Sequence, residues 1–434
     1  MKVWDALVIG AGPAGCAAAY DLARAGRKVL LLDRSDFPRQ KACAGGLTAK
    51  TIKALRYSIE PVIRQQMAQI RVERDENRSI VLRRRSDYCF MTVREELDAY
   101  CLRQTIAAGA EFQRIRAIQS IVQNESGVIV EIDGQILRTS FLIGADGVHS
   151  RVRQLTDPDA AWFWRAFALE ADVPCSATER QDLVFDFSPV RDGYGWIFPK
   201  ADHLNVGLYS YNQTEKIDRS RLNTYLQTRG ITQAPTRVIG QYAGFGAAGH
   251  SIAETRVFLI GDAGGFVDPL TGEGIYFAVV SGQAAAAAIH SDLSGNGPAH
   301  RHFARNTEAL RKNLDIATKA ARWFYSNLDE GFFYLSMPLL RSALLNTFAD
   351  GDKTCRAGFD GACQKHPQTC RCVNQFFEIF RTKLMRLRLK PDFLPAAFLK
   401  IQKNCTAITL RNFPKPLAAC AYKFSAMPKH NRNM

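Results

Sequence analysis

A glycine-rich turn and a carboxylate near the start of the chain have the spacing of a dinucleotide site. In this glycine turn (residues 10–15), Gly10, Gly12 and Gly15 follow an apolar run. The first glycine of such a turn permits a sharp bend, the second lets the backbone approach a pyrophosphate, and the third allows close packing of helix on strand. Asp33 follows Gly15 by 18 residues, close to the roughly 20-residue offset at which a carboxylate binds a ribose 2′-hydroxyl.

The helix expected after the glycine turn would complete this site. A pyrophosphate would lie over its N-terminus, close to Ala14, where free N–H groups and the helix dipole favour an anion. Asp33 would repel a 2′-phosphate, so the adenosine of FAD or NAD fits the site better than that of NADP. Arg34, the next residue, is predicted to belong to the same site.

A cysteine follows this predicted site along the chain. Residues 41–46, here called the cysteine loop, read Lys-Ala-Cys-Ala-Gly-Gly and bring Cys43 towards the dinucleotide. Free cysteines are often inert and buried, so the presence of a cysteine in this loop does not by itself indicate catalysis. A catalytic role would require the thiol to lie close to the cofactor. Glycine turn and cysteine together indicate a flavin enzyme more than a generic nucleotide binder. Ala44 and Gly45 are predicted cofactor contacts.

The composition is ordinary for a globular protein. The 434 residues suffice for two or three domains, with 47% apolar and 23% charged residues. The longest uncharged run, 274–291, is alanine-rich and contains a histidine and a glutamine, so we expect a buried helix there and no membrane span. No basic segment of a signal peptide precedes the apolar residues 6–19. These features predict a cytoplasmic protein.

Positive charge is concentrated in the tail. From residue 352 on there are 16 Lys and Arg against 4 Asp and Glu, a surplus of 12 in a net charge of +15. Residues 376–390 combine an apolar helical stripe with basic side chains, which suits peripheral contact with an anionic membrane or with an acidic electron-donor protein. A helix packed on the protein core is the alternative. No nucleic-acid motif accompanies the charge, so nucleic acid is not an expected partner.

Six of the 11 cysteines also lie in the tail. Four of them, with His366 between, could supply ligands for zinc or an iron–sulfur centre, but they lack the paired spacing typical of such sites. Unpaired thiols are therefore expected, and no metal is predicted. The weak candidates are Cys355, Cys363, Cys370 and Cys372.

Five stretches in a fixed order carry a more specific resemblance. They are the glycine turn with Asp33, the cysteine loop, Arg94, Gly-Ala-Asp-Gly at 144–147, and the two glycine-rich segments within 261–274. Between residues 147 and 261 lies a further segment, Tyr194-Gly-Trp-Ile-Phe-Pro, and Gly207 follows it. Over roughly residues 3–340 the chain resembles the FAD-dependent geranylgeranyl reductase family. That family belongs to a larger flavoprotein group, which includes aromatic-hydroxylase-type monooxygenases.

The resemblance implies an α/β fold, α+β overall. A Rossmann-type FAD-binding domain would carry an inserted antiparallel β-sheet substrate domain, and a helical C-terminal region would follow. The expected parts are residues 1–160 with 246–295 for FAD, 70–95 and 160–245 for the substrate sheet, 296–350 for the helical region, and 351–434 for a basic, cysteine-rich extension.

The resemblance also implies cofactor contacts in the second half of the chain. Asp262 would accept hydrogen bonds from the ribityl hydroxyls, and Gly264 would let the chain pass close to the phosphate. Gly272 and Gly274 would lie against the flat flavin ring. The helix from Gly274 would direct its positive end towards the flavin, and Ile275 is a predicted cofactor contact.

Two residues of the resemblance have alternative interpretations. Arg94 would reach the adenine end or the pyrophosphate as a planar cation, or it is an ordinary arginine on a helix surface. Asp146 would support the FAD site and the domain junction, or it only forms a structural turn.

The family places Cys43 by the flavin, where it would position an alkene or relay a proton. Members usually carry Cys-Gly-Gly-Gly where this chain has Cys-Ala-Gly-Gly. If position 44 requires a positive φ, Ala44 would strain the loop.

Four aromatic residues are predicted to line an apolar channel for a long isoprenoid or other lipid. Ordinary core packing is the alternative for any one of them. Tyr209 stands where the family has glycine, and its phenol would narrow the channel. The four are Tyr194, Trp196, Phe198 and Tyr209.

The implied activity is reduction of C=C bonds in a prenyl (geranylgeranyl-type) lipid or prenylated quinone by hydride from reduced FAD. Electrons would come from NAD(P)H or a ferredoxin-type carrier. One alternative is an NAD(P)H- and FAD-dependent monooxygenase of an apolar or aromatic substrate. The other is a non-enzymatic membrane or electron-transfer partner with structural FAD.

Overall fold

The computed structural model describes residues 3–75, 77–83, 87–176, 182–337, 341 and 348–350. The chain divides into two units, Met1–Gly351 and Asp352–Met434, and every described residue belongs to the first. The candidate metal ligands Cys355 to Cys372 and the basic segment 376–390 lie outside the described residues. Those two predictions therefore stay predictions.

A seven-stranded sheet carries the N-terminal motif. Its strands are β1 (Val3–Ile9), β2 (Val29–Asp33), β8 (Glu111–Arg114), β9 (Ile118–Asn124), β10 (Gly127–Ile132), β11 (Gln135–Gly144) and β17 (Val257–Leu259). Their order is β8-β2-β1-β11-β10-β9, with β17 beside β11. The pairs of β1 with β2 and β11, of β2 with β8, and of β11 with β17 are parallel. Because parallel strands end at one edge, this sheet aligns the turns that follow them.

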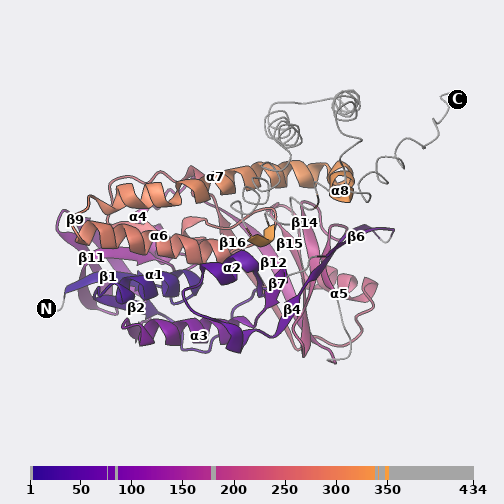
Figure 1. Cartoon of the computed structure of the whole chain (residues 1–434), viewed down its shortest axis with the longest axis horizontal. Coiled ribbons are helices and arrows are strands. Elements are labelled where there is room, and N and C mark those ends of the chain that lie inside the picture. Colours follow the sequence, from indigo (N-terminus) through magenta and orange to yellow (C-terminus); the bar gives the residue numbers. More distant parts are fainter. Residues whose placement is uncertain are drawn as a thin grey trace, which may run out of the picture. The chain divides into compact units, whose positions relative to one another are not determined.

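Both faces of the first sheet are buried. Ala6 and Val8 of β1 share a core with helices, whereas Leu7 and Ile9 pack in a second core with β9, β10 and α4. The apolar run of β1 is what a strand covered on both faces requires. Figure 1 shows α6 and α7 running together along this part of the molecule. The helices are α1 (Pro13–Arg24), α3 (Arg94–Ala107), α4 (Arg151–Thr156), α6 (Ile275–Leu293) and α7 (Ala299–Ser326).

Glycine lets α1 and α6 pack closely. A Cβ on Gly282 of α6 would lie 2.4 Å from the Ala14 carbonyl oxygen, and one on Gly261 would lie 2.9 Å from the Ala14 Cβ. Ala14 is itself buried. The start of α1 is thereby fixed against α6 and against the turn that precedes it.

A second seven-stranded sheet is built mainly from the middle of the chain. Its strands are β5 (Gln69–Asp75), β6 (Arg78–Arg83), β12 (Trp164–Pro174), β13 (Leu183–Asp186), β14 (Gly193–Pro199), β15 (His203–Ser210) and β16 (Arg237–Phe245). The order is β16-β12-β15-β14-β13-β5-β6. All its pairs are antiparallel except β13 with β5. The C-terminal part of α7 contributes Ala321 and Tyr325 to the core on this sheet, so α7 connects the two cores.

Smaller elements complete the described part of the chain. A three-stranded sheet has the order β3-β7-β4, and it places the end of the cysteine loop beside Met91. These elements are β3 (Gly46–Thr48), β4 (Gln65–Met67), β7 (Cys89–Met91), α2 (Ala49–Ala54), α5 (Arg219–Thr228), α8 (Leu328–Ser336), η1 (Glu60–Val62), η2 (Ala247–Gly249) and η3 (Gly261–Gly264).

The predicted fold class is confirmed. A Rossmann-type sheet with helices is combined with a largely antiparallel sheet inserted between its strands. Among the described helices, none combines the length and apolar character needed to span a bilayer.

Candidate cofactor and substrate site

The glycine turn connects β1 to α1, and two of its glycines are required by the protein's own packing. Gly10 has φ +104°, and a Cβ there would lie 2.3 Å from the Ala145 carbonyl oxygen. A Cβ on Gly15 would lie 1.8 Å from the Gly10 carbonyl oxygen. Gly12 differs, because a Cβ would meet only the Arg39 side chain, at 3.5 Å. The space next to Gly12 is thus available to a ligand.

Asp33 ends β2 and is tied to the glycine turn. Its Oδ2 accepts a hydrogen bond from the Ala11 N–H (2.7 Å), and its Oδ1 accepts one from the Ser35 N–H (2.8 Å). Each oxygen retains a lone pair for a ribose hydroxyl. Arg34 is exposed beside it.

Two helices begin at glycines near this turn. Gly12 is the N-cap of α1 and Gly274 that of α6, and neither helix has a side-chain cap or an acidic residue in its first turn. A Cβ on Gly274 would be no closer than 3.5 Å to Val267 and 3.7 Å to Asp262 Oδ1. The N–H groups from Ile275 onwards therefore remain available to a polar ligand, and the residues fit the phosphate and ring of FAD.

The turn after β17 places Asp262 in the same region. Its carboxylate accepts a hydrogen bond from the Gly244 N–H (3.3 Å). Burial raises the pKa of Asp262, while the cations of Lys41 and Arg94 oppose that rise. Gly264 has a packing role, because a Cβ would lie 2.5 Å from the Leu259 carbonyl oxygen. Its predicted approach to the phosphate stays a prediction.

Arg94 is buried, so the alternative of a helix-surface arginine is wrong. It is 8% exposed and donates two hydrogen bonds of 2.8 Å to Asp98. Arg39 pairs with the same carboxylate at 3.0 Å. Burial lowers the pKa of Arg94, but Asp98 and the Cys43 thiol raise it above its ordinary value. The guanidinium thus lies beside the cysteine loop.

Asp146 forms a structural turn at the start of α4. Its Oδ2 accepts hydrogen bonds from the N–H groups of Arg151 (2.6 Å) and Val152 (3.1 Å). Its Oδ1 is buried and has no hydrogen-bond partner within the described residues. A structural turn therefore explains the contacts of Oδ2. The Oδ1 atom remains available to a bound group, as the alternative role at the FAD site would require.

The left-handed residue of the cysteine loop is Gly45, not Ala44. Gly45 has φ +66°, whereas Ala44 is absent from the non-glycine residues with positive φ. A Cβ on Gly45 would lie 2.1 Å from the Thr92 carbonyl oxygen. Alanine at position 44 therefore does not strain the loop. The Gly45 N–H points to Cys43 Sγ at 3.4 Å.

Two buried charged residues hold this loop from distant parts of the sequence. Glu170 Oε1 on β12 accepts a hydrogen bond from the Cys43 N–H (2.9 Å). Lys200 Nζ, after β14, donates to the Thr92 carbonyl oxygen (2.8 Å). The Thr92 N–H and hydroxyl in turn donate to the Gly45 carbonyl oxygen at 2.9 and 3.0 Å. Sequence reasoning missed all three residues.

Burial acts on both charges. Burial raises the pKa of Glu170, and the Lys200 cation and the hydrogen bond from the Cys43 N–H oppose that rise. Burial lowers the pKa of Lys200, and Cys43 and Glu170 oppose that decrease. Glu170 is 4% and Lys200 2% exposed. One signal was available, since Glu170 interrupts a largely apolar strand segment and Lys200 directly follows one.

Three tyrosine hydroxyls hold the loop that leads to Gly272. Tyr209 donates to the Pro269 carbonyl oxygen (3.1 Å), Tyr325 to that of Leu270 (2.7 Å) and Tyr194 to that of Thr271 (2.5 Å). The hydroxyls of Tyr194 and Tyr209, two of the residues predicted to line a channel, are thus hydrogen-bonded within the protein. The bulk of Tyr209 has a structural explanation, which is its hydrogen bond to the loop.

The other two aromatic candidates also lie in packed surroundings. Trp196 Nε1 donates to Asn205 Oδ1 (2.7 Å), and a Cβ on Gly207 would lie 2.2 Å from the Trp196 ring. The Phe198 ring would lie 3.2 Å from a Cβ on Gly46. Phe198 therefore contacts the cysteine loop.

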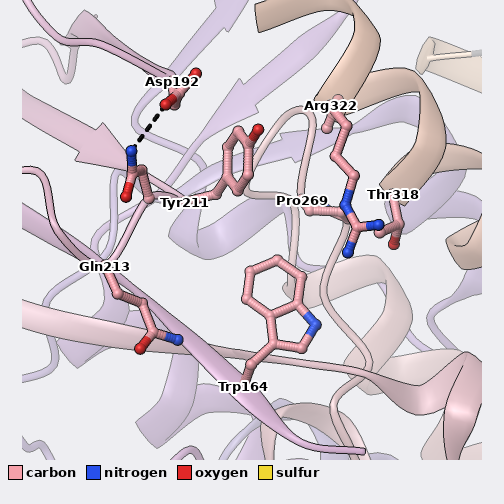
Figure 2. A pocket seen from close by; sticks show the side chains of 9 residues that line it. Trp164, Asp192, Tyr211, Gln213, Pro269, Thr318 and Arg322 are labelled. Atoms are coloured by element: carbon pink, nitrogen blue, oxygen red, sulfur yellow. Dashed lines mark hydrogen bonds between the residues drawn. The ribbon is translucent and has the colours of Figure 1, made fainter. Parts of the chain in front are cut away.

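A cleft of about 330 Å³ borders the 269–271 loop at Pro269. None of the four predicted aromatic residues lines it. Figure 2 shows Trp164 and Tyr211 on one side and Arg322 and Thr318 of α7 on the other, with Pro269 between. The lining residues are Trp164, Asp192, Tyr211, Asn212, Gln213, Pro269, Thr318, Ala321 and Arg322.

The chain is similar to several known proteins. Residues 3–319 match the family described as FAD binding domain. Geranylgeranyl diphosphate reductase of Rhodobacter capsulatus is 30% identical over 70% of this chain and 79% of its own length. Menaquinone reductase of Mycolicibacterium smegmatis is 28% identical over 71% of this chain and 83% of its own length.

A solved structure supports the fold. The geranylgeranyl bacteriochlorophyll reductase-like protein of Thermoplasma acidophilum superposes with a TM-score of 0.67 at 20% identity, over 86% of this chain and 99% of that one. The FAD-binding match over most of the chain and the 30% identity to the Rhodobacter reductase show the family. The chain belongs to the FAD-dependent geranylgeranyl reductase family and is an FAD-dependent oxidoreductase.

Proposed function

We propose that this protein reduces C=C bonds of a prenyl lipid or prenylated quinone, with Cys43 beside the reacting carbons. The observation that carries the proposal is the way in which distant residues fix the half-buried cysteine loop. Glu170 and Lys200 fix it from the second sheet, and Phe198 packs against it. An isolated alkene lacks an electron sink, so orientation and exclusion of water must supply much of the rate.

The predicted cofactor residues have distinct tasks. Asp33 and the N-terminus of α1 would bind the adenosine and pyrophosphate, and Asp262, Gly272 and the N-terminus of α6 would bind the ribityl chain and ring. Bound FAD in its reduced form would supply a hydride to one carbon of the double bond.

Cys43 would hold the proton for the other carbon. Its Sγ faces two cations, Arg94 and Lys200, whose pKa values it raises against the effect of burial. Donation of the thiol proton would leave a thiolate on Cys43. Glu170 would keep the loop in place through the Cys43 N–H.

Turnover of the chemically reduced holoprotein tests this proposal. We expect geranylgeranyl or menaquinone substrates to gain two hydrogens for each bond reduced, measured by mass spectrometry. Cys43→Ala should retain FAD and lose most of the rate, while Cys175→Ala, a change at another partly exposed cysteine, should not. Absence of any reduced lipid with FAD fully bound would contradict the proposal.

The same preparation addresses the monooxygenase alternative. Fast aerobic consumption of NADPH together with an oxygenated product would favour it. For the reductase, we propose NAD(P)H or a ferredoxin-type carrier as the electron donor. Anaerobic flavin reduction with each of them separates the two. A peripheral membrane contact of the tail is proposed as well, and it predicts liposome binding that is lost on truncation after residue 350.

A further inference from the structure

A largely buried ion pair connects α2 to the loop that precedes α6. Lys50 Nζ on α2 lies 2.7 Å from Glu273 Oε2, and the two side chains are 12% and 9% exposed. Thr48, at the end of β3, donates a hydrogen bond from its hydroxyl to Glu273 Oε1 (2.7 Å). Both carboxylate oxygens of Glu273 are therefore held by residues that directly follow the cysteine loop along the chain.

Aromatic rings surround the ammonium group of this pair. Lys50 Nζ lies 4.8 Å from the ring centroid of Tyr276, 5.7 Å from that of Phe277 and 5.8 Å from that of Phe348. Ring faces attract a cation but carry no net charge to neutralise it. Within the described part of the chain, Glu273 is the one carboxylate that forms an ion pair with Lys50. The two charges therefore compensate each other.

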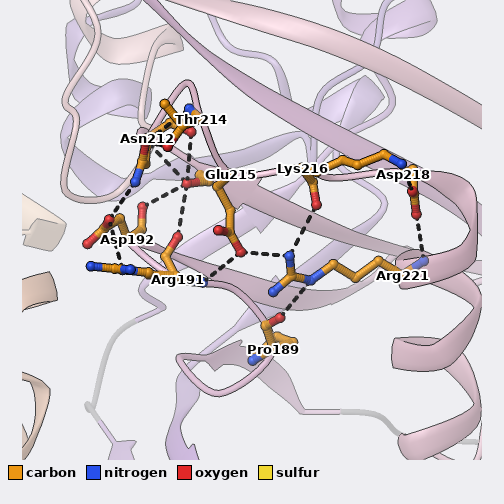
Figure 3. A network of polar contacts seen from close by, with 10 residues as sticks. Pro189, Arg191, Asp192, Asn212, Thr214, Glu215, Lys216, Asp218 and Arg221 are labelled. Atoms are coloured by element: carbon orange, nitrogen blue, oxygen red, sulfur yellow. Dashed lines mark hydrogen bonds and ion pairs between the residues drawn. The ribbon is translucent and has the colours of Figure 1, made fainter.

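This pair differs from the exposed ion pairs of the molecule. Figure 3 shows a polar network at the start of α5, in which Lys216 Nζ lies 3.3 Å from Asp218 Oδ2. Those side chains are 85% and 41% exposed, so water and salt screen their charges. The charges of Lys50 and Glu273 are screened less, and each acts on its surroundings inside the protein.

Glu273 lies between Gly272 and Gly274, which are predicted to contact the flavin ring. A carboxylate just before a helix is attracted to the free N–H groups of the first turn. Here Thr48 and Lys50 hold its oxygens, and no side chain caps α6. The first N–H groups of α6 thus stay available to a bound group, although a carboxylate lies next to them in the sequence.

The ionised form of Glu273 depends on its partners. Burial raises the pKa of Glu273, Lys50 and Thr48 oppose that rise, and Asp268 adds to it. Asp268 belongs to the same loop and accepts a hydrogen bond from the Leu270 N–H (2.8 Å). Lys50 therefore favours a charged Glu273 and at the same time compensates that charge.

We propose that Lys50, by neutralising Glu273, raises the reduction potential of the bound FAD. The inference rests on the proposed position of the flavin ring at the start of α6. Reduction of FAD to its anionic form takes up two electrons and one proton, so the ring gains one negative charge. The positive end of α6 would stabilise that charge, and an uncompensated carboxylate beside it would oppose it. Lys50 acts through Glu273 and is a positioning residue.

Reductive titration of the holoprotein with dithionite and a reference dye tests this inference without any lipid. Glu273→Gln keeps an oxygen for Thr48 and leaves the Lys50 cation uncompensated. We expect it to raise the equilibrium constant for reduction about tenfold, which is about 30 mV for a two-electron couple. Lys50→Met should lower the potential at about pH 9, where Glu273 stays ionised. Lys50→Arg keeps the charge and should stay close to wild type.

Opposite shifts separate an effect of charge from a structural effect. A merely structural pair predicts that Glu273→Gln and Lys50→Met change the potential in the same direction and weaken FAD binding alike. A charge effect predicts shifts of opposite sign that largely cancel in the double variant. Lys216→Met is the matched control, because it removes an exposed, paired lysine near α5 and should leave the potential unchanged.

Glu273→Gln decides the outcome, since its side chain has nearly the size of the original. A potential equal to or below that of wild type would overturn the inference. So would a Glu273→Gln protein that no longer binds FAD, because the carboxylate would then serve binding and not the potential. None of these results depends on lipid turnover. If no prenyl lipid is reduced, the proposed function fails, while the measured potentials still decide the role of Lys50.

Discussion

The glycine turn and the cysteine loop line the same predicted site but are held by different forces. In the glycine turn, hard contacts between backbone atoms decide the residue types, since a Cβ on Gly15 would lie 1.8 Å from the Gly10 carbonyl oxygen. In the cysteine loop, Glu170 and Lys200 decide the position through hydrogen bonds from residues 127 and 108 positions away from their partners. The first constraint is local and steric, and the second is distant and electrostatic.

The steric constraint should give the largest effect on substitution. We expect Gly15→Val to lose FAD and to lower the free energy of unfolding by about 3 kcal/mol, because the added atoms meet backbone that cannot yield. FAD content and thermal unfolding would measure this. Gly249→Ala is the control, since its Cβ would be 3.4 Å from Trp162. A Gly15→Val protein with normal flavin would show that the turn is less rigid than its geometry indicates.

Substitutions that remove the electrostatic constraint should give the second-largest effect. Glu170→Leu leaves the buried Lys200 without its neighbouring carboxylate, so we expect a loss of about 3 kcal/mol in unfolding free energy. Glu170→Gln keeps an oxygen for the Cys43 N–H and should be milder. In the second variant we expect kcat to fall more than KM while FAD stays bound. If both variants behaved alike, the hydrogen bond from the Cys43 N–H would be irrelevant to the loop.

Lys41 offers a pH test at the border of the two regions. Burial, and then the Arg94 cation, lower the pKa of Lys41 from 10.5 to about 8. Between these values the unfolded apoprotein binds more protons than the folded one, so its stability should increase with pH across this window. Denaturant unfolding of the apoprotein at about pH 7.5 and about pH 9.5 measures the increase.

Two variations sharpen that test. Lys41→Met should remove the increase, because the titrating group is gone. FAD should reduce it in the wild-type protein, because a nearby pyrophosphate favours the charged lysine. An increase that survives in Lys41→Met would assign the effect to another group.

The smallest effect is expected at Ala44. Because its φ is not positive, Ala44→Gly should lower the free energy of unfolding by less than about 1 kcal/mol, through the greater freedom of the unfolded chain. Turnover should be unchanged. A marked gain in stability or rate would show that alanine strains the cysteine loop after all.

Much of the fold could be predicted from the sequence, because local steric rules and apolar runs encode it. The turn after β1, the carboxylate at the end of β2 and the helix after Gly274 all have signatures within a few residues. Arg94 could not be placed, although Asp98, one helical turn later, was a clue to its buried pair. Glu170 and Lys200 were missed because their hydrogen-bond partners come from distant segments of the chain, and no short pattern records such contacts.

The hydrogen bonds from Tyr194, Tyr209 and Tyr325 to three successive carbonyl oxygens have a consequence for cofactor affinity. They come from β14, β15 and α7 and hold the approach to α6 without help from a ligand. A loop that is already ordered loses little conformational entropy when a ligand arrives. In the proposed site, the binding energy of FAD would therefore not be spent on organising this loop, and the ring would meet a surface shaped in advance by the second sheet.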